Sequence, residues 1–268
     1  MAWRRSAVRR RGFAALLALA SLTPLASLAQ PAAPAQAVQG CEILSRGHWA
    51  DASGNATLAQ AIEQRFEPVG PVLSEGYDAG AHWLRLLLRC EPGAVLRLPP
   101  AFLDHVDAHQ QDASRAWQLQ RRGDRVDDPQ AAWPATPRVD MLPPTHDAAG
   151  AALPSTVYLR VHTTSASLID VQALGRQQAD RRDNAETAAI WGYLGVVLAL
   201  TAWALLAVHR RERALAGCFV AYQLTGAVTV LALTGQMGAL WPALEPARHL
   251  AGSLAAIASA AAGALFCR

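Results

Sequence analysis

The segment TAAIWGYLGVVLALTAWALLAV, residues 187–208, contains no charged side chain. As an α-helix it would be about 33 Å long, which is enough to cross the hydrocarbon core of a bilayer. Three arginines, Arg210, Arg211 and Arg213, follow shortly after it. Because loops rich in positive charge stay on the cytoplasmic side, this end is expected inside the cell and the preceding chain outside. The sequence therefore predicts a membrane protein with an exported N-terminal region.

Two more apolar runs follow this segment. We expect three membrane helices, at about residues 187–208, 214–234 and 250–267, within a helical region of residues 176–268. Small residues recur at every fourth position of the last run: Ala251, Ala255, Ser259 and Gly263. Rows of small residues let helices approach closely in lipid, although a chain this rich in alanine also contains such rows by chance.

The N-terminal 29 residues have the features of a signal peptide. Five arginines lie among residues 4–11, an apolar stretch covers residues 13–28, and Ser27 and Ala29 are small residues just before the expected cleavage site. We expect cleavage after Ala29; the alternative is an uncleaved anchor. Residues 30–40, rich in Pro, Ala and Gln, are then a linker, and residues 30–186 lie in the periplasm, outside the inner membrane.

The net charge of +3 averages two different regions. Residues 30–186 contain 19 acidic residues and 14 arginines, a net charge of −5, and the other ten arginines lie at the N-terminus and around the membrane runs. The overall positive charge therefore does not indicate nucleic-acid binding, and we expect no nucleic-acid partner. All 24 basic residues are arginine, and this composition, with its many alanines, is typical of a GC-rich bacterial genome.

Short strands dominate the exported region, residues 41–175. In the segment Trp83–Arg89, alternation places three leucines (Leu84, Leu86 and Leu88) on one face, opposite Trp83, Arg85, Leu87 and Arg89. Further strands are expected at 95–98, 103–109, 116–121, 138–142, 156–162 and 167–173, separated by Pro, Gly and Asp clusters. This succession predicts an all-β sandwich. One helix is expected after Thr57, which can form a capping box with Gln60.

Several segments resemble, in their order, parts of a bacterial receptor family. Residues 49–54 (WADASG) and the strands at 83–89 and 156–161 are similar to parts of one type of extracellular domain, and residues 233–242 are similar to a loop between two membrane helices. Over about residues 42–268 the chain resembles the bacterial seven-transmembrane receptors with diverse intracellular signalling modules (7TMR-DISM). The similar parts are their extracellular domain type 2 and the first three helices of their membrane bundle.

This resemblance implies a jelly-roll-like sensory sandwich that binds carbohydrate or a related small ligand. It also implies seven membrane helices and a cytoplasmic output module, commonly a histidine kinase or a diguanylate cyclase. The sequence stops after the third apolar run without such a module, so we expect it to be the ligand-sensing part of a receptor that signals across the membrane. The alternative is a truncated membrane interaction or structural subunit that does not signal.

Aromatic and arginine side chains of the exported region are candidates for ligand binding. Tryptophan and tyrosine rings can stack on a sugar, and arginines can supply convergent polar groups. The candidates are Trp83, Arg85, Trp117, Trp133, Tyr158 and Arg160. The alternative is that most of these rings pack in the core. Trp133 lies between Asp128 and the pair Pro134 and Pro137, and it is the ring most expected to be exposed on a loop.

The segment His105-Val106-Asp107-Ala108-His109 is a weak candidate for a metal site. On a strand its two histidines and its aspartate share one face, and these are suitable zinc ligands. Residues on the same face of a strand, however, lie roughly 6.5–7 Å apart, which is wide for a single ion. The alternative is a solvated strand face. We therefore expect no metal and no cofactor.

The exported region contains two cysteines, and the sequence lacks the common catalytic motifs. Cys41 and Cys90 lie in the exported region, where they could form a disulfide or remain as two separate buried thiols. The sequence has no Gly-rich phosphate loop, no CxxC pair, no HExxH and no GxSxG motif, so we expect no enzyme activity. The expected partners are the lipid bilayer, a small ligand, and a second copy of the chain or a partner signalling protein.

Overall fold

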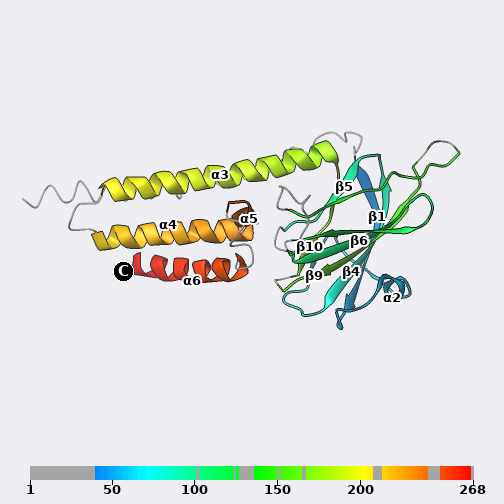
Figure 1. The fold of residues 1–268 in the computed structure, drawn as a ribbon, viewed down its shortest axis with the longest axis horizontal. Coiled ribbons are helices and arrows are strands. Elements are labelled where there is room, and N and C mark those ends of the chain that lie inside the picture. The colour runs from blue at the N-terminus through cyan, green and yellow to red at the C-terminus, as the bar shows by residue number, and fades with distance from the viewer. Residues whose placement is uncertain are drawn as a thin grey trace, which may run out of the picture. The chain divides into compact units, whose positions relative to one another are not determined.

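The computed structural model describes residues 40–100, 103–123, 125–126, 136–148, 150, 152–164, 167–207, 213–240 and 248–266. Within these ranges, an antiparallel β domain is followed by α-helices (Figure 1). The predicted signal peptide, the linker up to residue 39, Trp133 and the pair Arg210 and Arg211 lie outside the described residues.

The largest sheet has six strands, in the order β2-β1-β4-β9-β6-β7. These strands are β1 (Cys41–Asp51), β2 (Glu67–Pro68), β4 (Ala81–Cys90), β6 (His105–Gln111), β7 (Trp117–Arg122) and β9 (Ser155–His162). Every neighbouring pair is antiparallel. Segments far apart in the sequence therefore lie side by side, and β4 pairs with both β1 and β9 (Figure 1).

Two smaller antiparallel sheets complete the β domain. One has the order β11-β5-β8, made of β5 (Ala94–Arg97), β8 (Arg138–Asp140) and β11 (Gln172–Gly175). The other pairs β3 (Val72–Ser74) with β10 (Leu168–Asp170). The predicted single strand at 167–173 is thus wrong, since the chain changes sheet at Val171: β10 pairs with β3 and β11 pairs with β5.

One apolar core lies between the large sheet and the small ones. The predicted inward face of β4, with Leu84, Leu86 and Leu88, is confirmed, because all three side chains are buried in this core. They meet side chains of the smaller sheets, among them Leu96, Val139 and Ile169. Burial of such side chains is the main stabilising term of a β domain of this kind.

Strand β1 is absent from the strands that alternation predicts. Its buried and exposed positions do not alternate cleanly along Cys41–Asp51. The reason is a register shift between Ile43 and Ser45, where an extra residue interrupts the pairing with β4. A bulge moves the following side chains to the opposite face, so a period-two search cannot recognise the strand.

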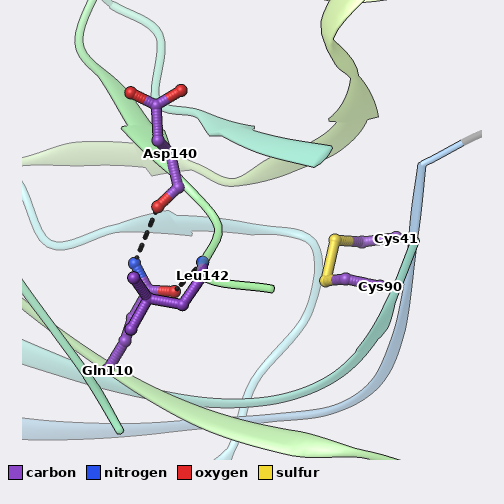
Figure 2. Close-up of a disulfide and its surroundings, with 5 residues drawn as sticks. All are labelled: Cys41, Cys90, Gln110, Asp140 and Leu142. Carbon is purple, nitrogen blue, oxygen red and sulfur yellow. Dashed lines mark hydrogen bonds between the residues drawn. A yellow bond between two sulfur atoms is a disulfide. The ribbon is translucent and has the colours of Figure 1, made fainter. Parts of the chain in front are cut away.

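A disulfide joins Cys41 and Cys90, which lie opposite each other in the register of β1 and β4 (Figure 2). Both cysteines belong to the apolar core. Of the two alternatives that the sequence left open, the structure contains the disulfide. Figure 2 also shows Gln110 of β6, whose amide nitrogen donates to the carbonyl oxygen of Asp140 over 3.0 Å and whose amide oxygen accepts from the backbone nitrogen of Leu142.

Helix α2 (Leu58–Ile62) begins with the predicted capping box. The Thr57 hydroxyl accepts a hydrogen bond from the backbone nitrogen of Gln60, and the Gln60 side chain accepts one from the backbone nitrogen of Thr57. Two amide groups that have no partner inside the helix are satisfied in this way. The prediction of a helix start at Thr57 is confirmed.

The helical region comprises α3 (Arg176–Ala207), α4 (Arg213–Leu233), α5 (Gln236–Leu240) and α6 (Arg248–Phe266). Two segments are long and apolar enough to cross a membrane, Arg176–Leu206 and Leu215–Leu233. The apolar stretch of α6, Leu250–Leu265, is shorter. The described residues therefore contain two candidate membrane spans, where the sequence predicts three.

Helices α4 and α6 lie side by side (Figure 1), and small residues line their contact. A Cβ atom added at Gly252 would lie 2.9 Å from the Cβ of Ala232, and one added at Gly226 would lie 3.7 Å from the Ser259 hydroxyl. At Gly263 the nearest neighbour is the ring of Tyr222, at 3.4 Å. The row of small residues on α6 thus includes contact positions, as expected for helices that approach closely in lipid.

Candidate ligand-binding face

The strand register brings five of the six predicted ligand residues onto one face of the large sheet. Trp83 lies opposite Arg160, and Arg85 lies opposite Tyr158, across β4 and β9. Residues directly opposite each other project from the same side of a sheet. We call this side, which faces away from the leucine core, the outer face; its central residues are Trp83, Arg85, Asp107, His109, Trp117, Arg121, Tyr158 and Arg160.

Aromatic packing forms the base of the outer face. Trp83 is 1% exposed and Tyr158 is 7% exposed, and both belong to one buried cluster with Ala61 of α2 and with Phe66, which follows that helix. The ring centroids of Phe66 and Tyr158 are 5.9 Å apart in an edge-to-face arrangement. Trp83 and Tyr158 are therefore packing residues in this structure, the alternative that the sequence left open for most of the rings.

Among the described rings of the set, Trp117 on β7 is the accessible one. It is 37% exposed, and its centroid lies 5.7 Å from that of Tyr158, again edge to face. Its contact with Tyr158 fixes the indole against the sheet while part of its surface stays open to solvent. An exposed aromatic surface held by a buried one has the properties that stacking on a ring-shaped ligand requires.

A charged group lies beside the aromatic base. The Nη1 atom of Arg160 is 3.1 Å from Asp107 Oδ2, and its Nη2 atom donates to the carbonyl oxygen of Gly54 over 2.6 Å. Arg121 Nε is 3.9 Å from the other oxygen of Asp107. One carboxylate is thus shared by two guanidinium groups, of which Arg160 is held firmly and Arg121 is largely exposed.

The turn that holds Gly54 was not among the predicted site features. Asp51 accepts hydrogen bonds from the backbone nitrogens of Ser53 and Ala56, and this fixes the chain so that the Gly54 carbonyl faces Arg160. Burial would raise the pKa of Asp51, but the hydrogen bonds, chiefly from Ser53, lower it below its ordinary value. The segment Asp51-Ala52-Ser53-Gly54 has the composition of an Asx turn, a signal that was available in the sequence.

Arg85 lies at the centre of the outer face with an exposed side chain. Its Cζ atom is 4.9 Å from the centre of the Phe66 ring, a cation–π distance. Among the described residues, no ion pair involves Arg85. Its neighbour in β1 is Gly47, where a Cβ atom would lie 2.8 Å from that of Phe66. Only glycine leaves room there for the ring beneath Arg85.

The weak metal candidate is not assembled as a site. Asp107 is engaged with Arg160, the His109 ring stacks on Trp83 at 5.8 Å, and His105 stacks on His162 at 6.2 Å. Burial lowers the pKa of His109; Asp107 opposes this effect, and Arg160 and Arg121 add to it. In the part of the chain that the structure describes, no group of three or more His, Cys, Asp or Glu side chains could hold a metal ion.

A second feature joins the β domain to helix α3, which contains the first candidate membrane span. Arg97 of β5 is 1% exposed, and its Nε atom is 2.7 Å from Asp183 Oδ1 of α3. Its Nη2 atom pairs with Glu186, and its Nη1 atom donates to the Gln172 side chain over 3.3 Å. A buried guanidinium needs such partners, because an unpaired charge is strongly disfavoured away from water.

Arg138 of β8 strengthens this attachment. Its Nη1 atom is 2.6 Å from Asp180 Oδ1, and its Nη2 atom pairs with Asp183. Asp180, Asp183 and Glu186 are spaced three residues apart and therefore share one face of α3. We call Arg97, Arg138, Asp180, Asp183 and Glu186 the junction. The acidic spacing was visible in the sequence, but the arginines that meet it were not.

Apolar packing supports the junction. Ala179 of α3 is fully buried against Val95 of β5 and Leu174 of β11. Helix α3 continues without interruption from these residues to Ala207. The first turns of the helix are thus packed and ion-paired to the β domain, while its later part is apolar enough to cross a membrane.

The hairpin of β6 and β7 contributes side chains to the outer face on one side and contacts strand β8 on the other. Its outward side chains include Asp107, Trp117 and Arg121. Its inward side chains Gln110 and Gln120 both donate to the carbonyl oxygen of Asp140 in β8, over 3.0 and 2.7 Å (Figure 2 shows the Gln110 bond).

Strand β8 also contacts helix α3. The Asp140 carboxylate pairs with Arg176 at the start of the helix, and Arg138 of the same strand pairs with Asp180 and Asp183. Polar contacts therefore run from the inward side of the β6–β7 hairpin, through β8, to α3.

An antiparallel β domain followed by two helices that are long and apolar enough to cross a membrane fits a membrane protein. Comparison with known families then shows what this domain is similar to: residues 46–174 match the family model described as 7TMR-DISM extracellular 2. No curated protein matches the chain. The predicted resemblance is confirmed for the extracellular domain, and the match indicates the extracellular sensing part of a receptor.

Proposed function

We propose that this chain is the ligand-sensing part of a bacterial transmembrane signalling receptor. In this proposal it lies in the inner membrane with residues 30–186 in the periplasm, and α3, α4 and α6 are the first three helices of a larger bundle. The role is binding rather than catalysis. The observation that supports it best is the outer face, where Trp117, Arg85 and Arg121 are all exposed to solvent.

The proposed ligand is a small molecule with a ring, such as a carbohydrate. Trp117 would stack on the ring, and Arg85 and Arg121 would donate hydrogen bonds to its substituents. Trp83 and Tyr158 would serve as the packed base that holds Trp117 in place. Arg160, engaged with Asp107 and Gly54, would fix the arrangement of the polar groups.

Ligand binding would bias the membrane helices through the β6–β7 hairpin. A ligand shifts such an equilibrium only by binding one arrangement more tightly than another. Movement of the hairpin would displace β8 through Gln110 and Gln120, and β8 would displace α3 through Arg138 and Asp140. A second copy of the chain or a partner signalling protein would receive this movement.

The test is ligand-dependent melting of the full chain in lipid nanodiscs against a panel of sugars and small metabolites. A binding ligand should raise the melting temperature, and the variant Trp117→Ala should lose the increase. Tyr77→Ala is the matched control, since Tyr77 is a highly exposed aromatic residue outside the strands. A panel without any shift would contradict the sensor proposal and favour the alternative structural subunit.

Hydrogen exchange tests the transmission step separately. A bound ligand should change the exchange rate of the backbone amides in residues 176–186, the part of α3 that contacts the β domain. The variant Gln110→Leu should reduce this change without abolishing ligand binding. Unchanged exchange in a ligand-saturated chain would rule out this route.

A further inference from the structure

We infer that the ligand of the outer face carries a carboxylate beside its ring, as an acidic sugar does. This inference rests on the proposed function and names the chemical class of its ligand. The observations that support it are the charge of the outer face, the surroundings of Arg85 and the geometry of the guanidinium group.

The central residues of the outer face carry a positive net charge, whereas the domain as a whole carries a negative one. Its central residues include three arginines, Arg85, Arg121 and Arg160, and one carboxylate, Asp107. Residues 30–186 as a whole have a net charge of −5. A local excess of one sign attracts ligands of the opposite sign and repels like-charged ones. The outer face therefore favours an anion in a domain whose overall charge would repel it.

Arg85 is placed where it can donate to a ligand. The Phe66 ring supports one side of its guanidinium at 4.9 Å, which leaves the N–H groups at the edge of the plane free to donate. Four residues further along β4 and on the same face, Arg89 is 3.2 Å from Glu42. Among the described residues, no carboxylate pairs with Arg85. The two arginines thus share a strand and a face but differ in whether a carboxylate is already bound.

The single carboxylate of Asp107 does not neutralise the positive charge of the three arginines. Arg160 holds one of its oxygens at 3.1 Å, and Arg121 approaches the other only to 3.9 Å with a side chain that is 68% exposed. An incoming carboxylate would find donors on Arg85, which pairs with no carboxylate among the described residues. Arginine binds carboxylates through two parallel hydrogen bonds, which also fix the orientation of the ligand.

Matched pairs of sugars provide the direct test. D-galacturonate and D-galactose, and D-glucuronate and D-glucose, differ only in a carboxylate that replaces a hydroxymethyl group. Isothermal titration of the full chain in nanodiscs should show that at least one acid binds about tenfold or more tightly than its neutral partner, as expected for a charge-assisted pair. The preference should weaken at high salt.

Variants of the two arginines identify the group responsible. Arg85→Gln should reduce the affinity for the acid to that for the neutral sugar, and Arg85→Lys should retain part of it, because lysine keeps the charge but not the planar pair of donors. Arg89→Gln, on the same strand and face, should leave both affinities unchanged. Melting without ligand should be the same for all three variants, which shows that they fold.

The outcomes separate the inference from the proposed function. Equal affinity for acid and neutral sugars, or a neutral ligand from the wider panel with no acidic preference, overturns the inference and leaves the sensor proposal standing. A preference for the acid that survives Arg85→Gln also overturns it. If the wider panel and both acids produce no binding at all, the proposed function fails together with the inference.

Discussion

Arg85 and Arg97 lie on consecutive strands, β4 and β5, and their surroundings are opposite. Arg85 is exposed over an aromatic ring, and no ion pair with a described residue occupies it. Arg97 is 1% exposed and is bound by Asp183, Glu186 and Gln172. An arginine that water solvates can stay available to a ligand. An arginine that is shielded from water needs charged or polar partners within the protein. The acids of the junction are paired with arginines of the same chain, whereas Arg85 of the outer face pairs with no described carboxylate.

This difference predicts that stability is concentrated near the junction and that the outer face contributes little to it.

Removal of the disulfide should have the largest effect. Cys41 and Cys90 lie 49 positions apart in sequence, and next to Cys41 a Cβ atom at Gly40 would meet the backbone of Gly175, just before α3. Closing a loop of this length restricts the unfolded chain by about 4 kcal/mol. The double variant Cys41→Ser/Cys90→Ser should therefore show a markedly lower midpoint of urea unfolding. Cys218→Ser, the free cysteine of α4, is the control and should not change it.

Arg97→Met should cost about 3 kcal/mol, because it leaves Asp183 buried with one arginine fewer. The measurement is urea unfolding of the full chain followed by tryptophan fluorescence, with hydrogen exchange of residues 176–186 as a local readout. Arg89→Met removes an exposed pair and should cost less than about 1 kcal/mol. Equal losses in the two variants would show that the junction is no more stabilising than the surface.

Asp183→Asn provides a double-mutant cycle on the same pair. If the junction acts as a unit, the combined variant Arg97→Met/Asp183→Asn should lose less stability than the sum of the two single variants. Additive losses would mean that the two side chains act independently.

Thr57→Ala should cost about 1 kcal/mol, because it removes the cap of α2. This helix covers Trp83 and Tyr158 on the outer face, so the fluorescence of the native state should shift toward that of exposed tryptophan. Thr57→Ser keeps the capping oxygen and serves as the control. A loss as large as that of Arg97→Met would contradict the proposed contrast between the two regions.

The smallest effect is expected at Asp112, in the turn between β6 and β7. Hydrogen bonds from Ser114, and then from Gln118 and Ala116, lower the pKa of its carboxyl group from 3.8 to about 2. A lowered pKa stabilises the folded chain above pH 3.8, and this contribution is lost as the pH falls from 3.8 toward 2. A carbon-13 titration of the carboxyl group should give this pKa. Ser114→Ala should raise it, and an unchanged value would refute the assigned cause.

Sequence reasoning succeeded where neighbours in the chain decide the structure. The alternation of Leu84, Leu86 and Leu88 predicts the buried face of β4, and the Thr57 and Gln60 pair predicts the start of α2. It failed for β1, where a bulge between Ile43 and Ser45 breaks the alternation, and for the strand at 167–173, where the chain changes partners.

The candidate site was predicted in composition but not in arrangement. Five of the predicted residues share the outer face, yet the sequence could not tell that Trp83 and Tyr158 would be buried beneath α2 while Trp117 stays exposed. Nor could it show that Asp107, expected beside two histidines, pairs with Arg160 instead. These outcomes depend on contacts between strands that are distant in the chain.

By itself, the sequence determined the exported region of short strands, the apolar helices and the side of each strand that is buried. Periodicity, capping and hydropathy are properties of adjacent residues and can be read without knowing the fold. The tertiary structure alone decided that Arg97 meets Asp183, 86 positions away, and that Arg85 meets no carboxylate among the described residues. Which distant charges share a buried position depends on strand order and register, and these are set by the packing of the whole domain.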